Sequence, residues 1–336
     1  MMSKVVRFNE TGSADVLKID KESVSEPGEG EVRLKVEAIG LNRAEVMFRE
    51  GQYLETPEFP SRLGYEASGI IEAVGPGAHN VEIGDKVSTI PVFSMGQYGV
   101  YGENPVVPSY AVTHYPDNLT PVEGTSIWMQ YITAFGALIE FGQLKVGDSV
   151  LVTAASSSVG LAAIQIAKAV SATVIATTRG ADKKSFLLDA GADHVIVTDE
   201  EDLADRVMNI TSGKGADIIF EPIGGAILEV LANAAAPGGL IFEYGALSPE
   251  PTPFPLFAAL GKGLTIRGYT LFEITKNSER LARAKTYIYE RLQAGELKPV
   301  IDRIFPFDDI VDAHRYMESG KQKGKIVVTV GSIHIG

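Results

Sequence analysis

The sequence predicts an α/β protein with two parts: a β-rich segment, and a segment containing a parallel sheet covered by helices on both faces. Residues 1–122 read as short apolar runs separated by turns, whereas from about residue 123 strands alternate with helical patterns across short connections. Apolar residues make up 45% and charged residues 22% of the 336 residues, which is typical of a folded chain with a large core.

Composition excludes several classes of function. The net charge of −13 argues against nucleic-acid binding, because that task requires a basic face. The absence of cysteine excludes disulfides, thiolate catalysis and cysteine-ligated zinc. Neither a signal peptide nor a membrane span is visible in the apolar pattern, so we expect a cytoplasmic protein with no membrane partner.

The first segment shows the alternation of half-buried strands. The run EVRLKVEAIGLN (31–42) places Val32, Leu34 and Val36 at every second position before it breaks at Gly40. Residues 67–90 contain two further β-rich runs around a Gly-Pro-Gly turn. We therefore expect strands and turns through residue 122.

The second segment alternates strands with helices, which predicts the parallel sheet. The expected strands are 149–153, 172–177, 194–198, 217–225 and 237–246. The expected helices are 158–170, 181–190, 201–211 and 226–235.

The tail contains one well-marked amphipathic helix and a final strand. We expect Ser278 to cap the helix and Gly295 to end it. The strand is expected at 324–330. The apolar stripe of the helix consists of Leu281, Ala284, Ile288 and Leu292.

A turn of small residues joins strand 149–153 to helix 158–170 and has the layout of a phosphate-binding turn. In the G-x-G-x-x-G frame its three glycine positions hold Ala155, Ser157 and Gly160. Phosphate is bound by backbone amides at a helix N-terminus, which any residue except proline supplies. The alternative is an ordinary strand–turn–helix with a serine cap. The predicted cofactor-binding residues here are Ala155, Ser156, Ser157, Ser158, Val159 and Gly160.

The end of the next strand indicates which dinucleotide is bound. A chain that binds NAD carries Asp or Glu there for the ribose hydroxyls, whereas this chain has Thr178 and Arg179, with Lys183 close behind. A guanidinium binds a 2′-phosphate through two hydrogen bonds, and a carboxylate would repel it. The pattern therefore favours NADPH. The alternative is that Arg179 is a solvated loop residue.

Several ordered blocks of sequence resemble one known family. AASSSVGLAAIQIAK (154–168), GLNRAEVMFREGQY (40–53) and RLGYEASGIIEAVGPGAHNVEIGDKV (62–87) carry most of the likeness. Three more blocks follow the family's order: QYITAFGAL (130–138), GGLIFEYGALS (238–248) and AHRYMESGKQKGKIVV (313–328). The chain resembles the zinc-free branch of the medium-chain dehydrogenase/reductase superfamily, which includes the zeta-crystallin-like NADPH:quinone oxidoreductases.

The resemblance implies a fold and an assembly. The fold is a Rossmann domain, with a doubly wound parallel sheet that binds NADPH, over 123–268. A GroES-like β-rich catalytic domain covers 1–122 and is completed by 269–336, with the cofactor in the cleft between the domains. A homodimer is also implied, in which GLTIRGYTL (263–271) pairs edge to edge with its twin. The alternative for this segment is an internal strand of the sheet.

The resemblance also implies that no metal takes part. Zinc-dependent relatives place Cys near Asn42 and Gly-His-Glu where this chain has Gly64, Tyr65 and Glu66. The structural-zinc cysteine cluster is missing, and the five histidines are scattered without ligand spacing. We therefore expect a mechanism without zinc.

The remaining chemistry needs a hydrogen-bond donor for the oxyanion that develops on the substrate. The resemblance implies Asn42, Tyr53 and Tyr65 as catalytic candidates, and a tyrosine hydroxyl donates while remaining neutral near pH 7. A structural alternative exists, in which Tyr65 fills the volume of a lost zinc ligand and Asn42 ties down backbone. Further cofactor contacts implied by the resemblance are Tyr131, Thr133, Ile223, Gly224, Gly225, Gly245, Ala246, Leu247 and, toward the phosphates, Lys325.

Three functions remain open. The leading hypothesis is hydride transfer from NADPH to a quinone. The second is an NADPH-dependent reductase of α,β-unsaturated carbonyls or enoyl thioesters. The third is a non-catalytic dinucleotide-binding protein, crystallin-like or associated with RNA, although the charge of −13 disfavours RNA.

Overall fold

The computed structural model describes residues 2–331, and their contacts divide the chain into two compact units. One unit contains the described residues up to Met129 and those from Pro299 onward, and the other contains Gln130–Lys298. The predicted ranges place the boundaries elsewhere, at 122/123 and 268/269. The contacts assign α10 (Phe272–Thr275) and α11 (Ser278–Gln293) to the second unit.

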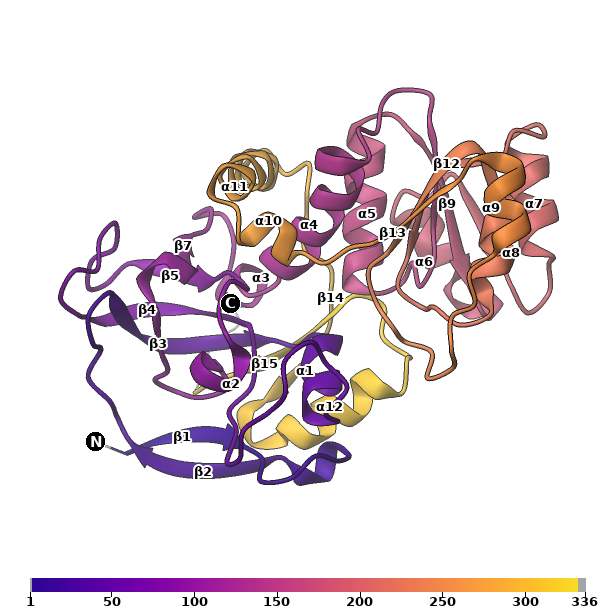
Figure 1. The fold of residues 1–336 in the computed structure, drawn as a ribbon. Helices are drawn as coiled ribbons and strands as arrows, with labels where there is room; N and C mark the ends of the chain where they lie inside the picture. Colours follow the sequence, from indigo (N-terminus) through magenta and orange to yellow (C-terminus); the bar gives the residue numbers. More distant parts are fainter. Residues whose placement is uncertain (1, 332–336) are drawn as a thin grey trace. The chain divides into compact units, whose positions relative to one another are not determined.

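The first unit is built on a seven-stranded sheet with the order β14-β15-β3-β4-β5-β7, in which β6 also pairs with β3 (Figure 1). All its pairs are antiparallel except β14 with β15. A separate hairpin pairs β1 (Met2–Arg7) with β2 (Lys18–Ser23). The strands of the larger sheet are β3 (Glu31–Gly40), β4 (Glu66–Val74), β5 (Lys86–Thr89), β6 (Val106–Pro108), β7 (Val112–His114), β14 (Ile301–Pro306) and β15 (Lys325–Thr329).

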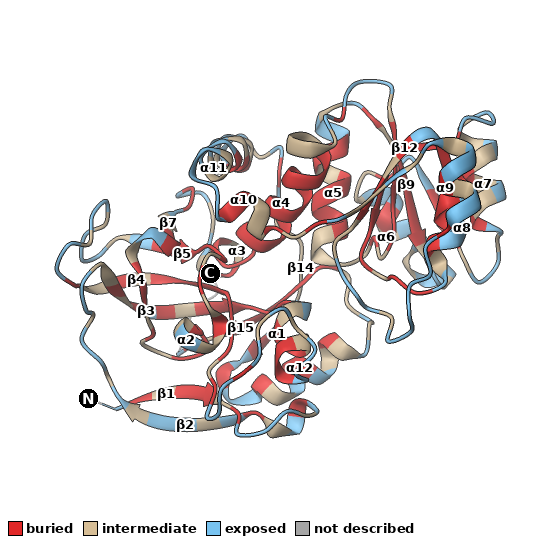
Figure 2. Ribbon diagram, viewed as in Figure 1, coloured by how far each residue is buried: buried red, intermediate tan, exposed pale blue. Residues whose placement is uncertain are grey.

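The alternation predicted from the sequence of β3 is confirmed. Val32, Leu34 and Val36 are buried, while Lys35 between them is exposed. Figure 2 shows β3 mostly in the colours of buried and intermediate residues. Four helices belong to this unit: α1 (Arg43–Arg49), α2 (Met95–Tyr98), α3 (Pro121–Gly124) and α12 (Ile310–Glu318). The buried Arg49 guanidinium joins α1 to α12 through the Glu318 carboxylate, at 2.7 Å, and through the ring of His314. Residues from the two ends of the chain therefore pack as one unit.

The second unit is built on a six-stranded sheet in which every pair is parallel, with the order β10-β9-β8-β11-β12-β13. This is the doubly wound Rossmann order, with its switch point between β8 and β11. The predicted fold class is confirmed. The strands are β8 (Ser149–Val152), β9 (Thr173–Thr178), β10 (His194–Val197), β11 (Ala216–Glu221), β12 (Ala235–Glu243) and β13 (Thr265–Gly268).

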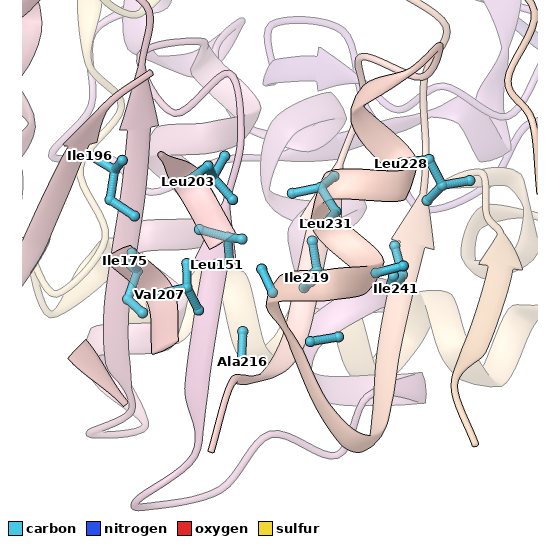
Figure 3. Packing of buried hydrophobic residues seen from close by; sticks show 13 residues of the cluster. Leu151, Ile175, Ile196, Leu203, Val207, Ala216, Ile219, Leu228, Leu231 and Ile241 are labelled. Atoms are coloured by element: carbon cyan, nitrogen blue, oxygen red, sulfur yellow. The ribbon is translucent and has the colours of Figure 1, made fainter. Parts of the chain in front are cut away.

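Helices cover both faces of this sheet. A buried hydrophobic cluster joins α7 and α8 to one face, where Leu151, Ile175 and Ile219 project from the strands (Figure 3). The crossovers β8–α5–β9 and β11–α8–β12 run in opposite directions along the sheet, so the right-handed rule places α5 on the other face. The helices of this unit include α5 (Ser158–Ala169), α6 (Lys184–Asp189), α7 (Leu203–Ile210), α8 (Ile227–Ala234) and α9 (Leu256–Lys262), while α4 (Trp128–Phe135) spans the boundary between the units.

The amphipathic helix of the tail forms where it was expected, with one difference at its start. Asn277, rather than Ser278, is the N-cap, because its side chain accepts a hydrogen bond from the backbone amide of Arg280 at 3.0 Å. Ala284, Ile288 and Leu292 of the predicted stripe are buried, and Leu281 is half-buried.

Candidate functional site

The turn between β8 and α5 presents backbone amides at the switch point of the sheet. Ser157 is the N-cap of α5, and its Oγ accepts from the Gly160 amide at 3.0 Å. The first-turn amides of Ser158 and Val159 have no acceptor within the helix, as in every helix N-terminus. In an open parallel sheet this is where an anionic ligand binds.

Two backbone features explain how the turn forms with one glycine of three. A Cβ at Gly160 would lie 2.6 Å from the carbonyl oxygen of Ala155, so close packing of helix against turn requires glycine there. The left-handed step is made by Ala154, whose φ is +45°. A non-glycine residue in that region carries a cost in energy, so the geometry is held by the packing around it.

Cationic side chains lie near the same turn. Arg179 is exposed directly after β9, and Thr178 at the end of that strand donates through Oγ1 to the carbonyl oxygen of Gly180 at 3.1 Å. Lys183 Nζ donates to the Ser156 hydroxyl at 3.1 Å, so the loop after β9 and the turn before α5 are joined. The structure therefore places Lys183 beside the predicted phosphate-binding residues.

The loops after β11 and β12 lie against each other. The Leu247 amide donates to the carbonyl oxygen of Pro222 at 3.0 Å, and the Ser248 amide to that of Ile223 at 2.7 Å. Gly224 and Gly225 have φ values of +70° and +69°, a conformation that side chains disfavour. Gly245 and Ala246 are exposed on the second loop. The residues predicted here are thus brought together by backbone hydrogen bonds.

Sequence reasoning missed the buried carboxylate beneath these loops. Glu221, the last residue of β11, accepts from Thr153 Oγ1 at 2.5 Å, from the Gly224 amide at 3.0 Å and from the Ile223 amide. Burial raises its pKa, and burial together with the Glu221 charge raises the pKa of Glu243, at the end of β12, to about 7. Glu221 therefore shapes the loop that follows it. The signal in the sequence was an acid at the carboxyl end of a buried strand.

Two predicted residues of α4 have buried environments. The Tyr131 hydroxyl donates to Gln165 Oε1 at 2.8 Å, and the same amide oxygen accepts from the Lys298 backbone at 3.1 Å. The predicted contact of Tyr131 with the nicotinamide stays a prediction, and its hydroxyl is bonded within the protein. Thr133 is 6% exposed.

In the first unit, a buried ion pair occupies the positions where zinc-dependent relatives place ligands. Lys325 Nζ lies 2.5 Å from Glu66 Oε2 and 2.6 Å from Asn42 Oδ1. Asn42 Nδ2 donates to the same Glu66 oxygen at 3.1 Å, and the Met129 amide donates to the other oxygen at 2.8 Å. The sequence predicted that Lys325 reaches cofactor phosphates, but the structure places its ammonium against the side chains of Glu66 and Asn42. The amide of Asn42 is likewise engaged there.

A second carboxylate borders this cluster. Glu45 is completely buried and accepts hydrogen bonds from the backbone amide of Asn42 at 2.7 Å and from the backbone amide of Tyr65 at 3.1 Å. Burial raises its pKa to about 7, although the Lys325 charge opposes the shift. Glu45 is therefore a carboxyl group whose pKa lies near neutral pH.

The two candidate tyrosines form a pair next to this cluster. The hydroxyls of Tyr53 and Tyr65 are hydrogen-bonded, and their ring centroids are 6.4 Å apart. Burial raises the pKa of Tyr53 to about 12 and raises that of Tyr65 further, so both remain protonated at neutral pH. Tyr65 is 1% exposed and also contacts Phe93, with 5.7 Å between centroids, whereas Tyr53 is partly exposed. The pair offers a phenol donor beside an aromatic surface.

Within residues 2–331, no group of three or more His, Cys, Asp or Glu side chains is arranged to hold a metal ion. Four of the five histidines fall in that range, and His334 lies outside the described residues. No helix among the described residues is long and apolar enough to cross a membrane.

Comparison with known proteins identifies the family. A model described as "Alcohol dehydrogenase GroES-like domain" matches residues 28–117, and one described as "Zinc-binding dehydrogenase" matches residues 158–285. The human protein named quinone oxidoreductase is 31% identical over 334 residues, which cover 97% of this chain and 98% of that protein. The chain belongs to the medium-chain dehydrogenase/reductase superfamily. The predicted family is confirmed.

Other known proteins are similar to the chain over most of its length. The rat synaptic vesicle membrane protein VAT-1 homolog is 31% identical over 321 residues, which cover 91% of this chain and 78% of that protein. The Escherichia coli quinone oxidoreductase complexed with NADPH has a TM-score of 0.91 and 27% identity, with 97% of this chain and 99% of that chain covered. An NAD-dependent alcohol dehydrogenase has a TM-score of 0.90 and 31% identity, with 98% and 100% covered.

Proposed function

We propose that this chain is an oxidoreductase that transfers a hydride from NADPH to a quinone without zinc. The observation that carries the proposal is the turn before α5. Its first-turn amides face the switch point of the parallel sheet, and Lys183 is bonded to Ser156 of the same turn. The similarity to quinone oxidoreductases, one of them in complex with NADPH, supports the same conclusion.

The residues around the switch point fit a dinucleotide. A Cβ at Gly160 would lie 2.6 Å from a backbone oxygen, and a Cβ at Gly245 would lie 2.7 Å from another. The backbone can pack this closely at both positions only because the residue is glycine. Small side chains in the turn let a pyrophosphate approach the amides of Ser158 and Val159. When bound, NADPH supplies the hydride for the reaction.

Arg179 and Lys183 support the choice of NADPH over NADH. Both are cationic, and neither Asp nor Glu stands at the end of β9 where an NAD-binding chain carries one. We expect Arg179→Ala to weaken NADPH binding by roughly 10- to 100-fold, the equivalent of one charged hydrogen bond of about 1.5–3 kcal/mol, with little change for NADH. Titrations of both cofactors into wild type and variant measure this. Equal losses of affinity for NADPH and NADH would mean that Arg179 stabilises the fold rather than binding the 2′-phosphate. A wild type that prefers NADH would overturn the cofactor assignment.

The first unit supplies the donor for the substrate. A quinone that accepts a hydride must also gain a proton to become a hydroquinone, and negative charge develops on its oxygen before that proton arrives. We assign the hydrogen bond to this oxygen to the Tyr53 hydroxyl, which is partly exposed and stays protonated because its pKa is raised to about 12. The proton itself is supplied by solvent.

The activity test is NADPH consumption with a panel of acceptors. Quinones, enones and enoyl thioesters are offered separately, and alcohols are offered with NADP⁺ in the reverse direction. The proposal expects the highest kcat/KM with quinones. A clear preference for enones or enoyl thioesters would favour the second hypothesis, and no turnover with any acceptor would favour a non-catalytic role.

We further propose that two copies of the chain associate through the edge of the Rossmann sheet. The strand β13 pairs with β12 on one side only and ends the order of the sheet. The neighbouring helix α9 exposes apolar side chains, with Phe257 86% and Leu260 71% exposed. Light scattering at micromolar concentration should give the mass of a dimer, and Phe257→Glu should shift it toward the monomer. A monomeric wild type would refute this assembly.

A further inference from the structure

The loop that carries Tyr53 has few buried apolar contacts: Pro57 is buried, and the Phe59 ring contacts that of Phe8. It runs from Gly51 to Pro60, between α1 and β4, and contains no helix or strand. Leu54 is 73% exposed and Phe59 is 48% exposed. A donor that must meet one substrate atom needs a fixed position, so another interaction has to fix this loop.

One side chain in the loop makes that interaction. Glu55, two residues after Tyr53, accepts three hydrogen bonds from the start of α2. Its Oε1 accepts from the Ser94 hydroxyl at 2.5 Å and from the Gly96 amide at 3.1 Å, and its Oε2 accepts from the Met95 amide at 3.1 Å. Bonds to an ionised acceptor are among the stronger ones in proteins.

Tyr65 holds the phenol from the other side. It is buried against Phe93, the residue before the N-cap of α2, so it and Glu55 are anchored to the same region. The Tyr65 hydroxyl is hydrogen-bonded to that of Tyr53, so Tyr65 restrains the phenol from the side opposite Glu55.

We propose that Glu55 is a positioning residue, whose carboxylate fixes the loop Gly51–Pro60 so that Tyr53, held by Tyr65, directs its O–H at the acceptor oxygen of the substrate. The proposal deepens the proposed function and rests on it, because Tyr53 needs such a substrate. The Glu55 charge also raises the pKa of both phenols, which keeps the donated proton on Tyr53.

The test compares Glu55→Gln with Glu58→Gln. Glutamine keeps the shape of the side chain but turns an NH₂ group toward donors, so at least one anchoring bond is lost. Glu58 is exposed in the same loop and has no hydrogen bond or ion pair to any other described residue, so it controls for the lost charge. With a quinone acceptor, we expect Glu55→Gln to lower kcat/KM by about 10- to 100-fold at an unchanged NADPH dissociation constant, and Glu58→Gln to leave both unchanged.

A double-mutant cycle with Tyr53→Phe separates positioning from stability. If Glu55 acts through Tyr53, Glu55→Gln lowers kcat/KM no further once the hydroxyl is gone. Full additive losses would overturn the proposal, as would an unchanged kcat/KM in a folded Glu55→Gln protein. Glu55→Asp, which keeps the charge at shorter reach, should recover part of the loss.

Cleavage of the cofactor-free protein by chymotrypsin provides a readout independent of turnover. The peptide bonds after Tyr53 and Leu54 are cleavage sites in the loop, and Leu54 is 73% exposed; we expect faster cleavage in Glu55→Gln than in wild type, Glu58→Gln or Tyr53→Phe. Equal cleavage rates would mean that Glu55 does not anchor the loop. A wild type inactive with every acceptor would refute the proposed function and the role of Tyr53 with it, while cleavage would still decide whether the anchor exists.

Discussion

Replacing Lys325 by methionine would remove the ammonium from the buried cluster that also contains the carboxyl groups of Glu45 and Glu66. Among the described residues in contact in this cluster, Lys325 is the only lysine. The Lys325 side chain is 0% exposed and that of Glu66 is 1% exposed, with 2.5 Å between Nζ and Oε2. In Lys325→Met the Glu66 carboxylate keeps its bonds from Asn42 and Met129 but has no opposite charge nearby.

The expected loss in the free energy of unfolding depends on how deeply the ion pair is buried rather than on the distance between its charged atoms. Removing one partner of a buried ion pair costs about 3–5 kcal/mol in the free energy of unfolding. The exposed pair Lys168–Asp193 provides a matched control, because its atoms are 2.7 Å apart while its side chains are 40% and 35% exposed. Lys168→Met should therefore cost about 0–1 kcal/mol.

A second substitution tests the reason for the loss. In Lys325→Met/Glu66→Gln, the amide oxygen at position 66 can still accept from Met129, and the NH₂ group can donate to the freed Asn42 oxygen. The double variant should therefore be more stable than Lys325→Met alone. Urea denaturation at neutral pH measures all three free energies. A loss under about 1 kcal/mol in Lys325→Met, or a double variant less stable than the single, would refute the reasoning. NADPH titration of Lys325→Met also tests the predicted phosphate contact.

Two other predictions concern buried groups of the site. The pKa of Glu45 in the folded protein is raised to about 7, so between about pH 5 and pH 7 the folded protein keeps a proton that the unfolded chain has released. The free energy of unfolding of wild type should therefore fall as the pH rises. Relative to Glu45→Gln, we expect a fall of up to about 3 kcal/mol between about pH 5 and pH 8. Urea titrations at several pH values check this, and a constant difference would contradict it. Gly160→Ala should cost about 1–3 kcal/mol and weaken NADPH binding, because the new Cβ meets the Ala155 carbonyl, whereas Gly261→Ala in α9, with open space around it, should not destabilise. Equal effects of the two substitutions on stability would refute the steric argument.

The helices and strands could be predicted from the sequence because the spacing of apolar residues and the residue types at turns depend on neighbouring residues only. The alternation in β3 and the βα alternation after residue 148 were sufficient to place strands, helices and the switch-point turn. Boundaries shifted by a residue or more where two candidates compete, as at Asn277 and Ser278, since both side chains can cap a helix.

The polar contacts of the candidate site could not be predicted, because they join distant parts of the sequence. Nothing near Lys325 shows that its ammonium meets Asn42 and Glu66, which are 283 and 259 residues away. A lysine has the same local signature whether it binds a cofactor phosphate or a buried carboxylate. For the same reason, Tyr131 gave no indication of its bond to Gln165.

The arrangement of β15 between β14 and β3 has a consequence for biosynthesis. The strand is among the last described residues to leave the ribosome, yet its partner β3 is made near the start. The N-terminal part therefore emerges with an open sheet edge and with Arg49 separated from Glu318. Residues 130–298 are contiguous and can fold as they appear, during synthesis. We expect the nascent chain to complete its middle first and its beginning last, so that its exposed β3 edge is the part that a chaperone must shield.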